Sequence, residues 1–120
     1  MADTQAVRIY HNPRCSTSRT VLGMLTDSGV DPEVVEYLKT GWTRQVLDEI
    51  LARSGLAPKD ILRRKEAIAQ ELRLDAASDK AILDAMIANP ILVERPIVVT
   101  ARGAVVCRPT ERVWEVVEPR

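Results

Sequence analysis

The order in which hydrophobic periodicity changes along the chain is the strongest constraint on its fold. Residues 7–10 (VRIY) have the apolar character of a short strand, and the stretch STSRTVLGMLTDSG that comes after the next loop has helical spacing before Gly29. Residues 34–38 (VVEYL) predict a second strand. Two strands joined by a helix are expected to be parallel, and the connection between them is expected to be a right-handed crossover. The chain therefore opens with a βαβ unit.

The middle of the chain predicts three helices. Thr43 is a cap residue for the first helix, which ends at Gly55. Pro58 suits the first turn of the second helix, which continues through KDILRRKEAIAQEL. Ser78 begins the third helix, and the dipeptide NP at Asn89 ends it.

The last third predicts two strands and a helix. Residues 96–100 (PIVVT) and 104–108 (AVVCR) are joined by the short link ARG, which favours an antiparallel hairpin. The stretch TERVWEVV predicts a final helix capped by Thr110. The whole order predicts an α/β protein with a thioredoxin-like (glutaredoxin-like) mixed four-stranded sheet. A three-helix insertion separates its βαβ and ββα halves.

Composition limits the class of protein. A chain of 120 residues that is 46% hydrophobic has enough apolar side chain for one core, so we expect a single domain over residues 1–120. The 17 basic and 17 acidic residues cancel, which argues against nucleic acid or a membrane surface as a partner. The N-terminus lacks the features of a signal peptide, and no apolar run is long enough for a bilayer. We expect a cytoplasmic monomer.

Cys15 stands where the first strand gives way to the first helix. At the start of a helix, unpaired backbone N–H groups and the helix dipole favour a thiolate and can also bind an oxyanion. The hydroxyls of Ser16, Thr17 and Ser18 add donors, and Arg19 adds positive charge unless it simply faces water. The alternative is that Cys15 is a small loop residue whose neighbours only cap the helix.

Two absences narrow the chemistry of Cys15. Ser18 stands where a dithiol CxxC motif would carry its second cysteine, so no local disulfide can form. An external thiol, or Cys107 if the fold brings it close, would have to resolve any redox cycle. Phosphatase-type loops need an arginine six residues after the cysteine, and that position is Val21. The phosphatase mechanism is therefore excluded.

Four separated stretches resemble one family. YHNPRCSTSR, ILRRK, NPILVERPIVVT and VCRPTE occur in the order found in the glutaredoxin-coupled arsenate reductases, the ArsC family, and the resemblance runs from about Ile9 to Val117. It implies the thioredoxin-like fold with a helical insertion. It also implies that Cys15 is the nucleophile and that three arginines hold arsenate, which by motif are Arg64, Arg95 and Arg108. Guanidinium groups match tetrahedral oxyanions with forked, permanently charged donors.

The sequence context of the three arginines supports an arsenate-binding role to different degrees. Arg64 lies in a basic run that is often a solvated face, and Arg63 is equally eligible. Arg95 and Arg108 stand at the ends of apolar strands beside prolines, where a charged residue points to a cleft more often than into a core. Alternation along the second hairpin strand places Cys107 opposite Arg108, which indicates a buried cysteine rather than a resolving one.

Three further residues are expected to support the site. By resemblance, Pro96 is the cis-proline that thioredoxin-like folds place against the active cysteine, although an ordinary strand start would also explain it. Asn12 and His11 are expected to shape the loop. His11 either modulates the thiolate or is a hydrogen-bonded structural residue.

The resemblance implies reduction of arsenate to arsenite, with glutathione and glutaredoxin as electron donors. We expect no bound cofactor and no metal, because one histidine and two distant cysteines give no zinc-ligand spacing. One alternative is an ArsC-like thiol oxidoreductase with another substrate. A second is a Spx-like regulator that binds RNA polymerase, although such proteins typically carry a CxxC switch and need no oxyanion clamp.

Overall fold

The structure, a computed structural model, describes residues 6–118, which form two compact units. The first contains the chain up to Tyr37 together with the chain from Arg95 onward, and the second contains Leu38–Glu94. Among residues 6–118, the longest helix has 12 residues, and no helix has the length and hydropathy of a membrane span.

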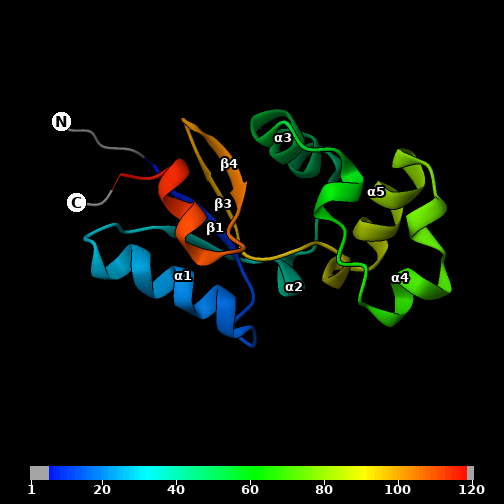
Figure 1. The fold of residues 1–120 in the computed structure, drawn as a ribbon, viewed down its shortest axis with the longest axis horizontal. Coiled ribbons are helices and arrows are strands. Elements are labelled where there is room, and N and C mark those ends of the chain that lie inside the picture. The colour runs from blue at the N-terminus through cyan, green and yellow to red at the C-terminus, as the bar shows by residue number, and fades with distance from the viewer. Residues whose placement is uncertain (1–5, 119–120) are drawn as a thin grey trace. The chain divides into compact units, whose positions relative to one another are not determined.

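The first unit is built on a mixed four-stranded sheet (Figure 1). Its strands are β1 (Arg8–His11), β2 (Glu33–Glu36), β3 (Ile97–Thr100) and β4 (Gly103–Val106), in the order β2-β1-β3-β4. β1 pairs with β2 in parallel and with β3 in antiparallel, so Ile9 lies between Val34 and Val98. β3 and β4 form the antiparallel hairpin. The predicted βαβ opening and C-terminal hairpin are both confirmed.

The helix α1 (Ser16–Asp27) follows β1 and buries one stripe of its surface. Ser18, Val21 and Leu25 recur every three or four residues and are each fully buried, as expected for one face of a helix. The face packs into an apolar cluster that also takes side chains from β1, β3 and β4. The cluster consists of Val7, Ile9, Val21, Leu25, Val30, Val98, Val105, Cys107, Val113, Val116 and Val117.

The C-terminal helical segment differs from the prediction. It is a 3₁₀-helix, η4 (Thr110–Glu115), preceded by Pro109, and Thr110 gives it no side-chain cap because its hydroxyl bonds Glu111 instead. The last turn is tight, since the N–H groups of Val116 and Val117 both bond the carbonyl of Val113. Six residues suffice to place Val113 in the core, where α1 and η4 contact each other on one face of the sheet (Figure 1).

The second unit is helical. Its elements are α2 (Tyr37–Thr40, which begins on the last residue of the first unit), α3 (Arg44–Ser54), η1 (Pro58–Ile61), α4 (Ala67–Glu71), η2 (Leu74–Ala76), α5 (Asp79–Ala88) and η3 (Pro90–Leu92). The predicted caps of the first and third helices are confirmed, because Thr43 accepts from the N–H of Val46 and Ser78 from that of Ala81. Gly55 ends α3 in the left-handed conformation, at φ 73°.

The predicted middle helix is wrong as a single element. The chain leaves the helical conformation at Leu62, which pairs with Val93 in an isolated antiparallel bridge. Two backbone hydrogen bonds flank that bridge, from Arg63 N to the Leu92 carbonyl (2.7 Å) and from Glu94 N to the Ile61 carbonyl (2.8 Å). This long-range pairing satisfies the backbone of two buried segments, so the helical pattern splits into η1 and α4.

The C-terminal ends of two strands also differ from the prediction. β2 ends at Glu36, because Tyr37 already belongs to α2. β4 ends at Val106, so Cys107 and Arg108 follow the strand rather than continue it. The alternation argument for these two residues therefore does not apply, although Cys107 is fully buried and Arg108 exposed as expected.

Candidate active site

Cys15 is the N-cap residue of α1. Its backbone is extended (φ −96°, ψ 122°), its N–H donates to the carbonyl of Asn12 (3.0 Å) and its carbonyl accepts from Arg19 N (3.0 Å). The residue is half-buried, and its side chain makes no capping hydrogen bond. The sulfur therefore stands beside the first N–H groups of a 12-residue helix while remaining open to a reactant.

The surroundings of Cys15 lower its pKa. Partial burial of the sulfur is the largest single effect and acts to raise the pKa, but the surrounding groups together lower it, led by the backbone N–H of Ser18 and the Arg95 side chain. The charge of Arg95 and the N–H of Thr17 lower the pKa further. Each of these groups stabilises the negative sulfur more than the neutral thiol. Cys15 is thereby favoured as a thiolate nucleophile.

A buried hydrogen-bond network holds the loop before α1. The Ser18 hydroxyl accepts from the backbone N–H of Asn12 (3.0 Å) and lies 2.6 Å from Nδ1 of His11. The Asn12 side chain in turn accepts from the N–H of Arg14 (3.0 Å). Ser18 is fully buried, and His11 and Asn12 are 5% and 7% exposed. The hydroxyl at the position of a second cysteine thus braces the loop, a role that the sequence pattern does not reveal.

His11 is held in its neutral form. Burial is the main cause of its lowered pKa, the charge of Arg19 lowers the pKa further, and Glu36 acts in the opposite direction. A neutral imidazole bonded to a buried hydroxyl is a structural arrangement more than a source of charge at the thiol. The structure thus places His11 in the network that shapes the loop.

Two of the predicted arginines are linked to each other in the first unit. Arg95, which is 7% exposed, precedes Pro96, and its side chain acts on Cys15 to lower the pKa of that thiol. Arg108 follows β4, and its Nη1 donates to the backbone carbonyl of Arg95 (3.2 Å). The peptide bond before Pro96 is cis, as the resemblance implies, and the bond before Pro109 is also cis, which the sequence did not predict.

The remaining predicted residues of the first unit flank the thiol. Ser16 is exposed and Thr17 is half-buried at the start of α1. Arg19 lies one turn into the helix, exposed, and its Nη1 donates to the carbonyl of Pro13 (2.8 Å). This bond ties the helix back to the loop and keeps a guanidinium at the edge of the site.

Arg64 belongs to the second unit, and its neighbour Arg63 has a different environment. The exposed Arg64 donates from Nη2 to the carbonyl of Lys59 (3.3 Å) and lines a cavity of about 390 Å³ with Gln70 and Asp75. The Arg63 side chain is 27% exposed and forms an ion pair with Glu66 (2.6 Å). Arg63 is thus tied to a carboxylate, whereas Arg64 keeps a guanidinium without an ion pair among the described residues.

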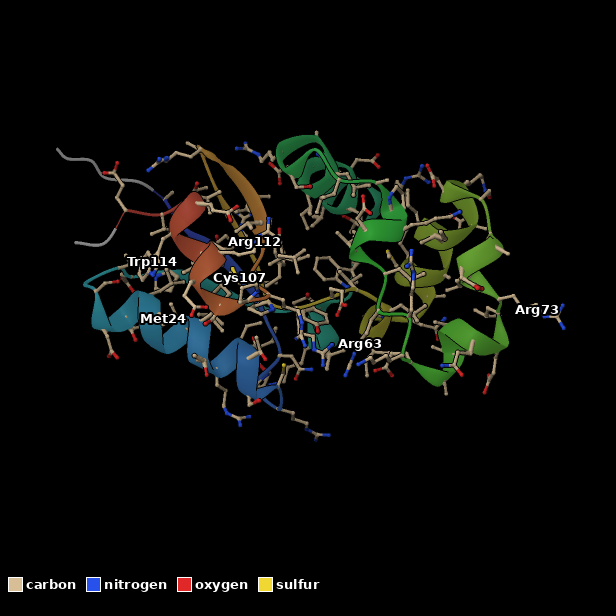
Figure 2. The ribbon with its side chains drawn as sticks, viewed as in Figure 1. Met24, Arg63, Arg73, Cys107, Arg112 and Trp114 are labelled. Carbon is tan, nitrogen blue, oxygen red and sulfur yellow. The ribbon has the colours of Figure 1, made fainter. Side chains whose placement is uncertain are left out.

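The second cysteine is placed for packing. Cys107 is fully buried in the core of the first unit, and burial raises its pKa to about 12. Met24 and Trp114, labelled with Cys107 in Figure 2, pack against the same cluster. A thiol in this setting is a small hydrophobic residue and not a nucleophile. Within residues 6–118, no group of three or more His, Cys, Asp or Glu side chains could hold a metal ion.

Comparison with known proteins identifies a family over nearly the whole chain. Residues 10–116 match the ArsC family. The arsenate reductase ArsI2 of Synechocystis is 46% identical over 112 residues, which cover 92% of this chain and 80% of that protein. The uncharacterized protein YfgD of Escherichia coli is 44% identical over 117 residues, 95% of this chain and 98% of YfgD.

The solved structures agree with the sequence comparison. The arsenate reductase from Vibrio cholerae superimposes with a TM-score of 0.91 at 39% identity, and the match covers 96% of this chain and all of that one. A likeness of this extent includes the sheet, the helical insertion and the loop that carries Cys15. The thioredoxin-like fold predicted from the order of elements is therefore confirmed.

Proposed function

Because this chain belongs to the ArsC family, we propose that it reduces arsenate to arsenite with Cys15 as the nucleophile. The observation that carries the proposal is the position of Cys15 at the N-terminus of α1 against Arg95, where its pKa is lowered. A nucleophilic sulfur and donors for an oxyanion then occupy one place, as attack on a tetrahedral anion requires.

The reaction begins at the sulfur of Cys15. The thiolate attacks pentavalent arsenic, an S–As bond forms, and one arsenic oxygen leaves as water after protonation. Glutathione then forms a second S–As bond and displaces another water. A glutaredoxin thiolate attacks the glutathione sulfur, so the electron pair of that S–As bond stays on arsenic and reduces it to the trivalent state. Water releases arsenite from Cys15, and the glutathione pool reduces the glutaredoxin mixed disulfide.

Arsenate is held by donors that do not change charge during the reaction. In this proposal the anion accepts hydrogen bonds from the N–H groups at the start of α1 and from the guanidinium groups of Arg95 and Arg108, while Ser16 and Thr17 add hydroxyls. Arg64 stays the third arginine that the ArsC resemblance implies for arsenate. Arg63 is its direct competitor for that role.

We also propose that the protein acts as a cytoplasmic monomer and needs neither a metal nor a bound cofactor. Glutathione is a cosubstrate, and glutaredoxin is a transient partner. A site of this kind can work without a metal or a bound cofactor, because a cysteine at a helix N-terminus supplies the nucleophile and the arginines supply the positive charge.

The test is a coupled assay. Purified protein is mixed with glutathione, glutaredoxin, glutathione reductase and NADPH, and arsenate-dependent loss of NADPH is followed for the wild type, Cys15→Ser and Cys107→Ala. We expect turnover in the wild type and in Cys107→Ala, and none in Cys15→Ser. Absence of turnover from folded wild type would contradict arsenate reduction by these donors and favour another thiol substrate.

A further inference from the structure

A groove lies on the first unit beside the loop that carries Cys15. It has a volume of about 580 Å³ and runs between α1 and β2, lined by Pro13, Arg19, Leu22, Gly23, Asp31 and Val34 among others. A volume of this size is in the range of pockets that hold a ligand or a protein side chain. The proposed function assigns it no role.

The groove uses a face of α1 that does not build the core. Arg19, Leu22, Gly23 and Thr26 are spaced by three or four residues and therefore share one side of the helix, distinct from the buried stripe. Across the groove, Val34 of the edge strand β2 is 43% exposed, one of few large apolar side chains so exposed among residues 6–118. The groove is therefore an apolar surface that the described chain leaves open.

Gly23 keeps the groove open. A Cβ atom built at this position meets no atom within 4 Å, so the surroundings do not require glycine. Glycine inside a helix costs about 1 kcal/mol relative to alanine, which makes it a poor choice for stability. A side chain at position 23 would therefore project into the groove, and glycine leaves that space free.

Charge distinguishes one end of the groove. The guanidinium of Arg19 is fixed beside the Cys15 loop by its bond to the Pro13 carbonyl, and forms no ion pair with any residue of the described chain. Arg14, next to Cys15, is exposed as well. Asp31 also lines the groove and contributes a carboxylate. An occupant that is apolar along the helix and acidic where it meets Arg19 would complement this end of the groove.

We propose that the groove between α1 and β2 docks the protein thiol donor that reduces the arsenic adduct, glutaredoxin in the proposed function. An apolar side chain of the donor enters over Gly23, and a carboxylate of the donor meets Arg19. The inference rests on the proposed function. Cys15 does not itself line the groove. A small thiol bound in the groove would therefore not be in contact with the Cys15 sulfur. A folded protein is large enough to contact the groove and the Cys15 loop at the same time.

The variant Gly23→Leu tests the docking without touching the catalytic groups. It fills the groove, and Thr20→Leu is the matched control, because Thr20 is exposed on α1 outside the lining. In the coupled assay we expect the KM for glutaredoxin to rise about tenfold in Gly23→Leu only, as for the loss of one well-packed contact. The KM values for arsenate and glutathione should stay at the wild-type values.

A second variant and a direct binding measurement distinguish loss of docking from a folding defect in Gly23→Leu. Gly23→Ala adds one methyl group, is expected to raise the melting temperature and should raise the glutaredoxin KM less than leucine does. Binding of glutaredoxin to Cys15→Ser, followed by NMR shifts, should perturb α1 and β2 and weaken when Gly23→Leu is added. Equal glutaredoxin KM values for folded Gly23→Leu and Thr20→Leu would overturn the docking site. Absence of wild-type turnover would instead overturn the proposed function.

Discussion

The Nη1 atom of Arg108 donates a hydrogen bond to the backbone carbonyl of Arg95 across 3.2 Å. This contact joins the segment that follows β4 to the segment that precedes β3, and so ties Arg108 to the backbone of the arginine whose side chain lowers the pKa of Cys15. The Arg95 side chain lowers the pKa of Cys15, while Arg108 is exposed and anchored through the backbone of Arg95. The proposed function therefore predicts different roles for the two arginines, with Arg95 acting on the sulfur and Arg108 on the substrate.

Replacing Arg108 by glutamine should weaken arsenate capture. Loss of charge-assisted hydrogen bonds to the anion should lower kcat/KM for arsenate about 10- to 100-fold, chiefly through KM. Steady-state kinetics with varied arsenate measures this change. Arg102→Gln is the control, because Arg102 is exposed and pairs with Glu118. Equal kcat/KM values for the two variants would remove Arg108 from the site.

Replacing Arg95 by glutamine should raise the pKa of Cys15. The Arg95 side chain lowers that pKa through its hydrogen bond and its charge, so its removal favours the neutral thiol. The rate of Cys15 alkylation by iodoacetamide, measured against pH, should reach half its maximum at a higher pH than in wild type. Arg14→Gln should leave the profile in place, and a profile unchanged in Arg95→Gln would show that helix N–H groups alone set the pKa.

Much of the fold was predictable because its signals are local. The apolar run before Cys15, the caps Thr43 and Ser78 and the glycine-containing hairpin link each act within a few residues. The break at Leu62 was not predictable, because it depends on pairing with Val93, a partner distant in the sequence. A helical pattern cannot report a bridge that tertiary structure imposes.

The same distinction applies to the site. The position of Cys15 at a helix start follows from a local change of periodicity, and the motif resemblance implied the cis bond before Pro96, which the structure contains. The arginines that the resemblance implies stay a prediction. The bracing role of Ser18 was missed, since a hydroxyl beside a cysteine predicts an anion donor as readily as a buried hydrogen-bond acceptor. Side-chain direction decides between these roles, and only the structure shows it.

Replacing Ser18 by alanine should destabilise the protein. The substitution leaves the buried N–H of Asn12 and Nδ1 of His11 without their hydroxyl partner, which costs about 1–3 kcal/mol of unfolding free energy. Urea denaturation measures the loss. Ser16→Ala, at an exposed position two residues earlier, should change stability far less. Equal stability of the two variants would show that the network does not hold the loop.

The lowered pKa of His11 predicts acid sensitivity. In the unfolded chain histidine takes up a proton near pH 6.5, whereas folded His11 resists protonation because it is buried. Below about pH 6.5 the unfolded state therefore binds more protons than the folded state, and stability falls as the pH drops toward the folded pKa. Unfolding free energies of wild type and His11→Gln, measured from neutral to mildly acidic pH, should converge as the pH falls. Parallel curves would show that His11 is protonated as easily in the folded protein as in the unfolded chain.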